Sequence, residues 1–170
     1  SLRSIKGTQD ILPDQSHRWQ ALEAAIRSTM EHYNYKEIRT PAFERTELFT
    51  RGVGEETDIV SKEMYSWTDQ SGEKLTLKPE LTAPVARSFI QHNLGGQSPI
   101  NKLYYIDALF RRERPQKGRY RQFHQFGIEA FGSEHPEIDA EVIALAMSIF
   151  NNIGLGGLTL KLNSIGSPQC

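Results

Sequence analysis

The sequence predicts an α+β fold in which helices pack on a mainly antiparallel sheet. Two arms at residues 103–110 and 122–131 are rich in aromatic and aliphatic side chains and flank a charged loop, which predicts a β-hairpin. Apolar residues at helical spacing predict helices over about 15–32 and 137–152. Two shorter strand patterns, at 64–68 and 74–78, are joined by a polar turn that ends in glycine.

Composition limits the class of protein. A chain of 170 residues with 38% hydrophobic and 24% charged residues forms one domain or a little more. It has no apolar run of bilayer length and no signal-peptide pattern, so we expect a cytoplasmic protein without a membrane contact. The single cysteine, Cys170, excludes an intrachain disulfide, and no zinc ligand set is recognisable. The net charge of −1 argues against a general nucleic-acid binder.

The first third of the chain predicts a helix and a short strand. Residues 1–13 are an extended lead-in, after which Asp14 is expected to cap the first helix. The apolar positions of that helix are Trp19, Leu22, Ile26 and Met30. Residues 33–44 contain a short strand that ends at Pro41, which indicates a sheet edge or boundary. A helical turn at 46–51 and a surface loop at 52–64 follow.

In the later part of the chain, prolines and glycines predict where strands and helices begin and end. Pro79 ends the strand at 74–78, and a helix then runs to about His92, with Pro84 in its first turn and Ala83, Ala86 and Phe89 inward. Residues 93–99 are expected to form a loop. Pro136 starts the second long helix, Gly154 stops it, and 158–162 is predicted to be a short strand.

The charged loop and the second arm of the hairpin look like a small-molecule site. Cations crowd residues 111–121 around one acid, Glu113; they are Arg111, Arg112, Arg114, Lys117, Arg119 and Arg121. Such a loop favours a phosphate-bearing ligand. Alternation along the second arm puts Phe123, Gln125, Gly127, Glu129 and Phe131 on one face and His124 on the other. The plain alternative is a solvated basic hairpin tip with core residues behind it.

These residues carry a resemblance to a known family. Residues 110–132, FRRERPQKGRYRQFHQFGIEAFG, resemble motif 2 of the class II aminoacyl-tRNA synthetases in the form of the histidyl enzymes. Residues 33–44 resemble motif 1, residues 6–13 resemble the opening of the same enzymes, and motif 2 as a whole covers about 104–132. The resemblance implies a class II synthetase-like core: an antiparallel sheet flanked by helices.

The resemblance also implies roles for individual residues. Arg111 would contact the α-phosphate of ATP and the substrate carboxylate, Glu113 the adenine amino group, Arg119 the distal phosphates and Phe123 the adenine face. Mg²⁺ is expected with ATP. In the histidine site, Glu129 would accept a hydrogen bond from the imidazole, while the ammonium group would be held by Glu80, Thr82 and Gln125. The alternatives are a salt bridge from Glu129 to a loop arginine, and a helix-capping role for Glu80 or Thr82. Leu81 departs from the small residue found there in many relatives.

The resemblance covers nearly all of residues 1–170, but only as the N-terminal part of the catalytic domain. Motif 3 and the anticodon-binding domain are not found in this sequence. The implied function is ligation of histidine to tRNA(His) by a homodimer, and we expect this chain alone not to complete aminoacylation. The main alternative is a non-catalytic, synthetase-like regulatory subunit of ATP phosphoribosyltransferase. A plain RNA-binding module is a third possibility.

Overall fold

The protein is described by a computed structural model that covers residues 2–53, 63–114 and 116–163. Its elements, in chain order, are α1 (Pro13–His32), β1 (Lys36–Glu37), β2 (Phe43–Arg45), α2 (Thr46–Val53), β3 (Ser66–Thr68), β4 (Lys74–Leu77), α4 (Thr82–Gln91), α5 (Leu94–Gln97), β5 (Asn101–Phe110), β6 (Gln122–Phe131) and α6 (Pro136–Asn152). The predicted α+β class is confirmed. None of the helices in the described ranges has the length and apolar character that crossing a membrane requires.

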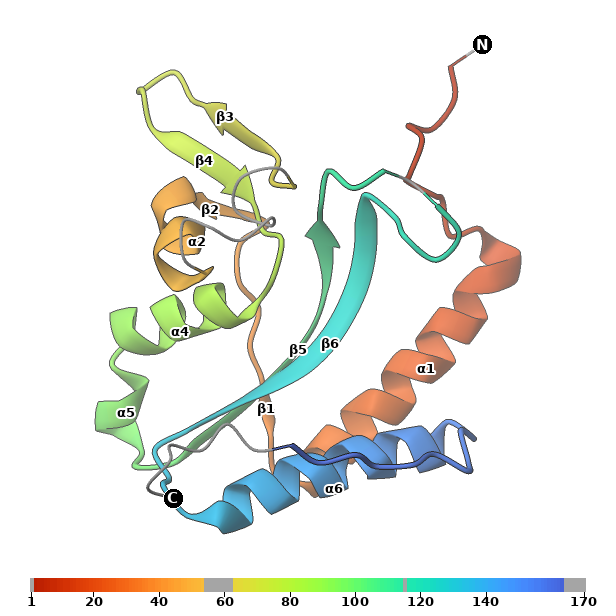
Figure 1. Cartoon of the computed structure of the whole chain (residues 1–170), viewed down its shortest axis with the longest axis vertical. Helices are drawn as coiled ribbons and strands as arrows, with labels where there is room; N and C mark the ends of the chain where they lie inside the picture. Colours follow the sequence, from red (N-terminus) through yellow and green to blue (C-terminus); the bar gives the residue numbers. More distant parts are fainter. Residues whose placement is uncertain (1, 54–62, 115, 164–170) are drawn as a thin grey trace.

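The predicted hairpin is the centre of the molecule (Figure 1). Strands β5 and β6 pair in antiparallel fashion along their whole length, from Asn101 opposite Phe131 to Phe110 opposite Gln122. Strand β1 adds to the other edge of β5, giving the order β1-β5-β6. Strands β1 and β5 are parallel, whereas the sequence predicted a mainly antiparallel sheet without a parallel pair. A parallel pair needs a long crossover, and the residues between β1 and β5 supply it.

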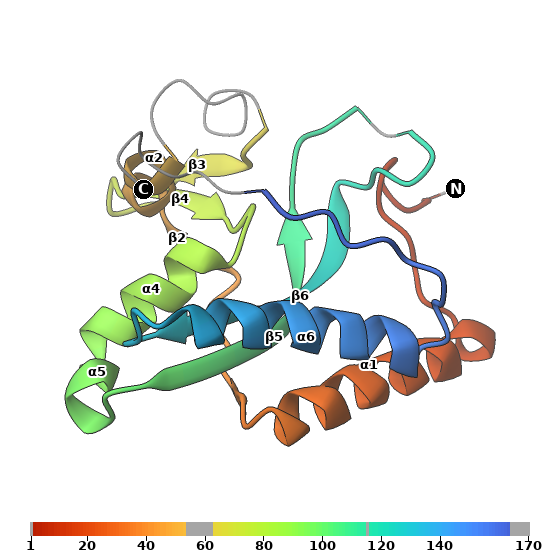
Figure 2. The same cartoon turned by 60° about the horizontal axis from the view of Figure 1, so that its bottom comes forward.

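Helices cover both faces of this hairpin. On one face, α1 and α6 bury Ile26, Met30, Leu145 and Ile149 against Tyr104 and its neighbours. On the other face, Leu81 and Val85 pack against residues of β5 and β6 that include Leu103, Tyr105, Leu109 and Phe123. Figure 1 shows α4 and α1 on opposite sides of the hairpin, and Figure 2 shows α6 running across it. The alternation predicted for the second arm therefore assigns its faces correctly.

A second, smaller sheet stands beside the first. Its strand order is β2-β4-β3, and both pairs are antiparallel. The Thr76 hydroxyl forms hydrogen bonds with the hydroxyl groups of Thr46 and Ser66, at 2.8 and 2.7 Å. The Thr46 contact ties the start of α2 to strand β4 of this sheet.

Several element boundaries differ from those predicted. Helix α1 begins at Pro13 and is preceded by Leu12 as N-cap, so Asp14 lies in the first turn and does not cap it. Proline suits this first position because its missing N–H has no helical partner there. Ile26 and Met30 are buried as expected, whereas Leu22 is exposed. Helix α2 extends the predicted turn to Val53; residues 54–62 of the predicted loop lie outside the described residues.

Other expectations were wrong. The predicted loop at 93–99 contains the short helix α5, which follows Asn93 in a left-handed conformation. The most buried positions around α4 are Leu81, Pro84 and Val85, so its inward stripe is shifted from Ala83, Ala86 and Phe89, which are half-buried. Phe89 still stacks on Phe131 of β6, with ring centroids 4.3 Å apart.

The strand predicted at 158–162 is absent. These residues have no regular structure and are exposed. An alternating apolar pattern becomes a strand only when another strand pairs with it, and the described residues offer none to this segment.

Candidate active site

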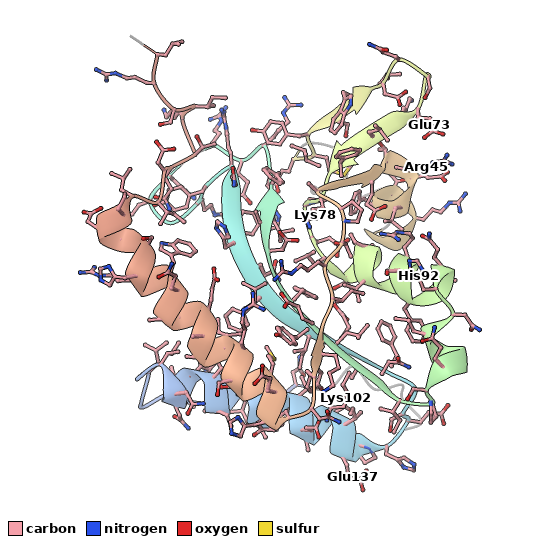
Figure 3. All side chains as sticks on the ribbon, turned by 180° about the vertical axis from the view of Figure 1, so that it is seen from behind. Arg45, Glu73, Lys78, His92, Lys102 and Glu137 are labelled. Atoms are coloured by element: carbon pink, nitrogen blue, oxygen red, sulfur yellow. The ribbon has the colours of Figure 1, made fainter. Side chains whose placement is uncertain are left out.

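The site is built where a loop between β4 and α4 crosses the end of β5. Lys78, 1% exposed, forms an ion pair with Asp107 of β5 and donates a hydrogen bond to the Thr40 carbonyl oxygen at 3.2 Å. The Phe110 N–H donates to the Lys78 carbonyl oxygen at 3.1 Å. Figure 3 shows Lys78 between the small sheet and the central hairpin. These contacts hold residues 78–82 over one face of β5 and β6.

Glu129 lies at the meeting point of this loop and the hairpin. Its Oε1 atom accepts a hydrogen bond from the Thr82 hydroxyl at 2.8 Å and another from the Tyr105 hydroxyl at 3.3 Å. Within the described residues, its Oε2 atom accepts no hydrogen bond and the carboxylate has no ion-pair partner. The predicted alternative, a salt bridge to a loop arginine, is not found among those residues. The carboxylate therefore keeps one oxygen for an external donor.

The Glu80 carboxylate lies close enough to Glu129 for the two charges to interact. Both of its carboxylate oxygens accept the Ala83 N–H, at 3.2 and 3.1 Å, so the side chain caps α4, as the helix-capping alternative predicted. Burial raises the pKa of the Glu80 carboxyl; the backbone N–H groups of Ala83 and Thr82 act against this rise, the charge of Glu129 adds to it and that of Arg111 opposes it. Two carboxylates thus face one region, which suits a cationic group between them.

Burial also keeps Tyr105 in its donor form. It raises the pKa of the Tyr105 hydroxyl far above its usual value, and the charge of Glu129 raises it further. A phenol that stays protonated is a permanent hydrogen-bond donor to the carboxylate.

Arg111 and Phe123 form the next part of the site, at the open end of the hairpin. The Arg111 guanidinium lies over the Phe123 ring, with its Cζ atom 5.1 Å from the ring centroid. Its Nε atom donates to the Pro79 carbonyl oxygen at 2.9 Å. An arginine anchored through Nε keeps its two terminal nitrogens available for a phosphate or carboxylate.

The charged loop is tied to the N-terminal lead-in. The N–H groups of Arg121 and Gln122 both donate to the Gly7 carbonyl oxygen, at 2.7 and 3.4 Å. Within the loop, Arg119 pairs loosely with Glu113, with 3.6 Å between the charged atoms; the Arg119 side chain is exposed and that of Glu113 is mostly buried. The loop therefore has defined ends and presents cations at its surface.

The predicted site residues fall into two neighbouring groups. Glu80, Thr82 and Glu129 come together directly, and Arg111 sits on Phe123. Gln125 lies on the same face of β6, opposite Asp107 in the register, and is exposed. Glu113 and Arg119 stand apart in the hairpin loop. His124, expected to be structural, packs edge-on against Trp19 on the opposite face, with ring centroids 4.8 Å apart.

Sequence reasoning missed three residues that shape the site: Tyr105, Asp107 and Lys78. The alternation of β5 could have indicated the first two, since an acid on an apolar arm stands out. Lys78 gave no signal, because a lysine beside a proline is usually exposed.

Comparisons with known proteins show which family the chain resembles. A family model described as "Histidyl-tRNA synthetase" matches residues 7–167. The chain is 60% identical over 166 residues to the histidine–tRNA ligase of Bacillus licheniformis, covering 96% of this chain and 39% of that protein. It is 54% identical over 168 residues to the ligase of Thermoanaerobacter pseudethanolicus, covering 99% of this chain and 40% of that protein.

Solved structures with the same fold include two of particular interest. The apo histidyl-tRNA synthetase of S. aureus matches with a TM-score of 0.78 and 44% identity, over 92% of this chain and 36% of that one. An ATP phosphoribosyltransferase regulatory subunit/histidyl-tRNA synthetase from Bacillus halodurans C matches with a TM-score of 0.76 and 27% identity, over 91% of this chain and 38% of that one. The chain spans about 40% of the length of the curated ligases that it matches.

Proposed function

The chain belongs to the histidyl-tRNA synthetase family, and we propose that it carries the ATP- and histidine-binding part of a histidine–tRNA ligase. In this reaction ATP activates histidine as an adenylate, and the histidyl group is then transferred to tRNA(His). The observation that carries the proposal is Glu129: a carboxylate on the floor of the site, fixed through one oxygen and open at the other. We expect a cytoplasmic location for this activity, because tRNA is aminoacylated in the cytoplasm.

Histidine would bind with its imidazole toward Glu129 and its ammonium group toward Glu80. An imidazole N–H would donate to the Glu129 Oε2 atom, and side chains without such a donor would leave that oxygen unpaired. A site of this kind discriminates strongly, because a buried polar group without a partner is costly. Glu80, with Thr82 and Gln125, would hold the ammonium group. The negative charge of Glu129 acts on Glu80, which supports binding of a cationic group in this part of the site.

ATP would lie along the open end of the hairpin. Phe123 would stack on the adenine, Glu113 would accept from its amino group, and Arg119 would contact the distal phosphates. The loose pairing of Glu113 with the exposed Arg119 supports these roles, because ATP could replace it at little cost. Mg²⁺ would arrive with the phosphates of ATP, because Mg²⁺ is usually bound through substrate phosphates and one or two carboxylates.

Arg111 would serve both substrates. In the adenylation step the histidine carboxylate attacks the α-phosphate and pyrophosphate leaves, so negative charge grows on the phosphate oxygens. A guanidinium already fixed by Pro79 and Phe123 meets that charge without having to reorganise, which lowers the barrier. Holding the two reactants in line would supply a further contribution of about 7–11 kcal/mol.

The proposal extends to a homodimer. Phe43 and Trp67 are 48% and 40% exposed and meet edge-on, with ring centroids 5.6 Å apart. The register puts both on one face of the small sheet, beside Leu75 and Leu77. Phe43 lies in the segment that resembles motif 1, and a second copy would cover this apolar face. Sedimentation of the chain and of a Phe43→Ser/Trp67→Ser variant tests this, with a dimer expected only for the unmodified chain.

A regulatory subunit of ATP phosphoribosyltransferase is the second candidate, because a structure described partly in those terms shares the fold. The higher identity to the ligases, 54–60% against 27%, supports the enzyme. So does the presence together of Arg111, Glu113, Phe123 and Glu129.

A thermal melt with Mg-ATP and a panel of amino acids tests the proposed function. A ligand at a hundred times its dissociation constant adds about 2.7 kcal/mol of stability. For a domain of this size that corresponds to a rise in Tm of roughly 5–10 °C. We expect the rise with histidine and ATP and no comparable rise with the other amino acids. Equal shifts with all amino acids, or none with histidine, would contradict a histidine site.

A further inference from the structure

Tyr105 and Gly127 form a unit beneath the proposed histidine site. They lie directly opposite each other in the register of β5 and β6. A Cβ atom at Gly127 would come within 2.4 Å of the Tyr105 hydroxyl oxygen and within 2.6 Å of Cζ. The hydroxyl end of the Tyr105 ring therefore occupies the space that a side chain at position 127 would need. From there the Tyr105 hydroxyl reaches Glu129, which lies two residues after Gly127 in β6.

The two donors to Glu129 come from different elements. Thr82 begins α4, and Tyr105 stands in the middle of β5; both hydroxyls donate to Oε1. Thr82 is exposed, whereas Tyr105 is 5% exposed and packs in the core with Leu81 and Val85. A donor held by the core defines an orientation better than one at the surface, because its own rotamer is fixed by packing.

We propose that Tyr105, seated over Gly127, is a positioning residue that fixes the Glu129 carboxylate so that Oε2 faces the imidazole N–H of histidine. This inference rests on the proposed function and adds a specificity role for a residue that acts through Glu129. Without the Tyr105 hydroxyl, the Glu129 carboxylate would rotate about its terminal torsion. The Thr82 hydroxyl would then donate to either carboxylate oxygen, and Oε2 would no longer be held toward the imidazole. Histidine would then lose its preference over side chains of similar shape that lack an N–H.

The test compares two ligands in the unmodified chain and in Tyr105→Phe. Histidine is titrated against 3-(2-thienyl)alanine, which has a five-membered aromatic ring of similar size without an N–H, in the presence of Mg-ATP. Tyr105→Phe should weaken histidine about tenfold, the loss expected for one charge-assisted hydrogen bond, and leave the analogue unchanged. A merely structural role would weaken both ligands equally, and that result would overturn the proposal.

Two further variants sharpen the result. Tyr33→Phe is the matched control: it also deletes a hydroxyl hydrogen bond, to Ser148 of α6 at 2.9 Å, but Tyr33 lies at the end of α1, so the affinity ratio should stay unchanged. In a Glu129→Gln background, Tyr105→Phe should have no effect on histidine affinity, because the two residues act through one contact. A full tenfold loss there would overturn the proposal.

The outcomes separate this inference from the proposed function. Selective histidine binding that Tyr105→Phe leaves unchanged would overturn the positioning role and leave the function standing. Absence of histidine binding by the unmodified chain would overturn both. Far-UV circular dichroism of each variant establishes that it is folded before its affinities are compared.

Discussion

Glu80 shows at the scale of one residue how a binding role works against stability. Its carboxyl is buried beside a second acid, which raises its pKa in the folded state. A carboxyl of this kind binds a proton more tightly when folded than when unfolded. Stability therefore falls as pH rises from the unfolded-state pKa, about 4.3, through the folded-state value. The charged form of Glu80 is therefore the one that the fold disfavours, and a bound ammonium group would favour it.

The corresponding prediction is that Glu80→Gln stabilises the free chain at neutral pH and weakens histidine binding. The amide still offers an oxygen to the Ala83 N–H but carries no charge. Melts at pH 7.5 should show a higher Tm than the unmodified chain, and the gain should shrink as pH approaches about 4.3. Glu134→Gln, at an exposed acid, serves as the control. A gain that persists unchanged at low pH would contradict this explanation.

Residue-level prediction from sequence succeeded where a residue's direction follows from its own strand. Alternation alone placed Phe123, Gln125 and Glu129 on one face, and the structure agrees. Glu80 and Thr82 were predictable from their place at a strand-to-helix junction. The partners of Glu129 were not, because the Tyr105 contact depends on the register of two strands and on the space above Gly127.

At the scale of elements, the hairpin depends on the glycine in β6. Gly127→Ala should destabilise the chain by about 1–3 kcal/mol, because the added methyl overlaps the Tyr105 ring in a packed core. Gly156→Ala is the matched control, since a Cβ atom there meets nothing within 4 Å, and it should change stability by less than about 0.5 kcal/mol. Urea unfolding of both variants measures the difference. Equal stabilities would show that the ring moves aside freely.

The loop between β4 and α4 depends in the same way on one buried ion pair. Asp107→Ala should cost about 3 kcal/mol, the lower end for a broken buried pair, because it leaves the Lys78 charge buried while Asp107 itself is partly exposed. Asp10→Ala, at an exposed acid of the lead-in, should cost little.

The double variant Lys78→Met/Asp107→Ala shows whether the stability lost in Asp107→Ala comes from the unpaired Lys78 charge or from lost packing. It should recover part of the loss, because no unpaired charge remains. A double variant less stable than Asp107→Ala would contradict this explanation of the loop.

Element types were predictable wherever the apolar pattern was long. The hairpin arms and the two long helices were found with boundaries within about two residues. Short elements depended on partners that the local sequence does not show. The segment 158–162 has a strand pattern but no strand to pair with in the described residues, and β1 finds a parallel partner more than sixty residues away.

At the scale of the whole molecule, the site is assembled from segments distant in sequence. The lead-in holds the charged loop through Gly7, the Lys78 loop brings Glu80 and Thr82, and the hairpin supplies Arg111 and Glu129. Strand β6 contributes to both proposed sites, with Phe123 for ATP and Gln125 and Glu129 for histidine, and the other contacts come from the loops around it. The central hairpin, covered by helices on both faces, is the support on which these parts meet (Figure 1).

The most direct test of this account is a calorimetric titration of histidine into the chain and into Glu129→Gln, with Mg-ATP present. The account predicts saturable binding of one histidine per chain, weakened about 100-fold by Glu129→Gln because the charged acceptor of the imidazole is lost. ATP affinity, titrated separately, should be the same in both proteins. Equal histidine affinity in the two proteins, or no binding to the unmodified chain, would contradict the assignment of this surface as a histidine site.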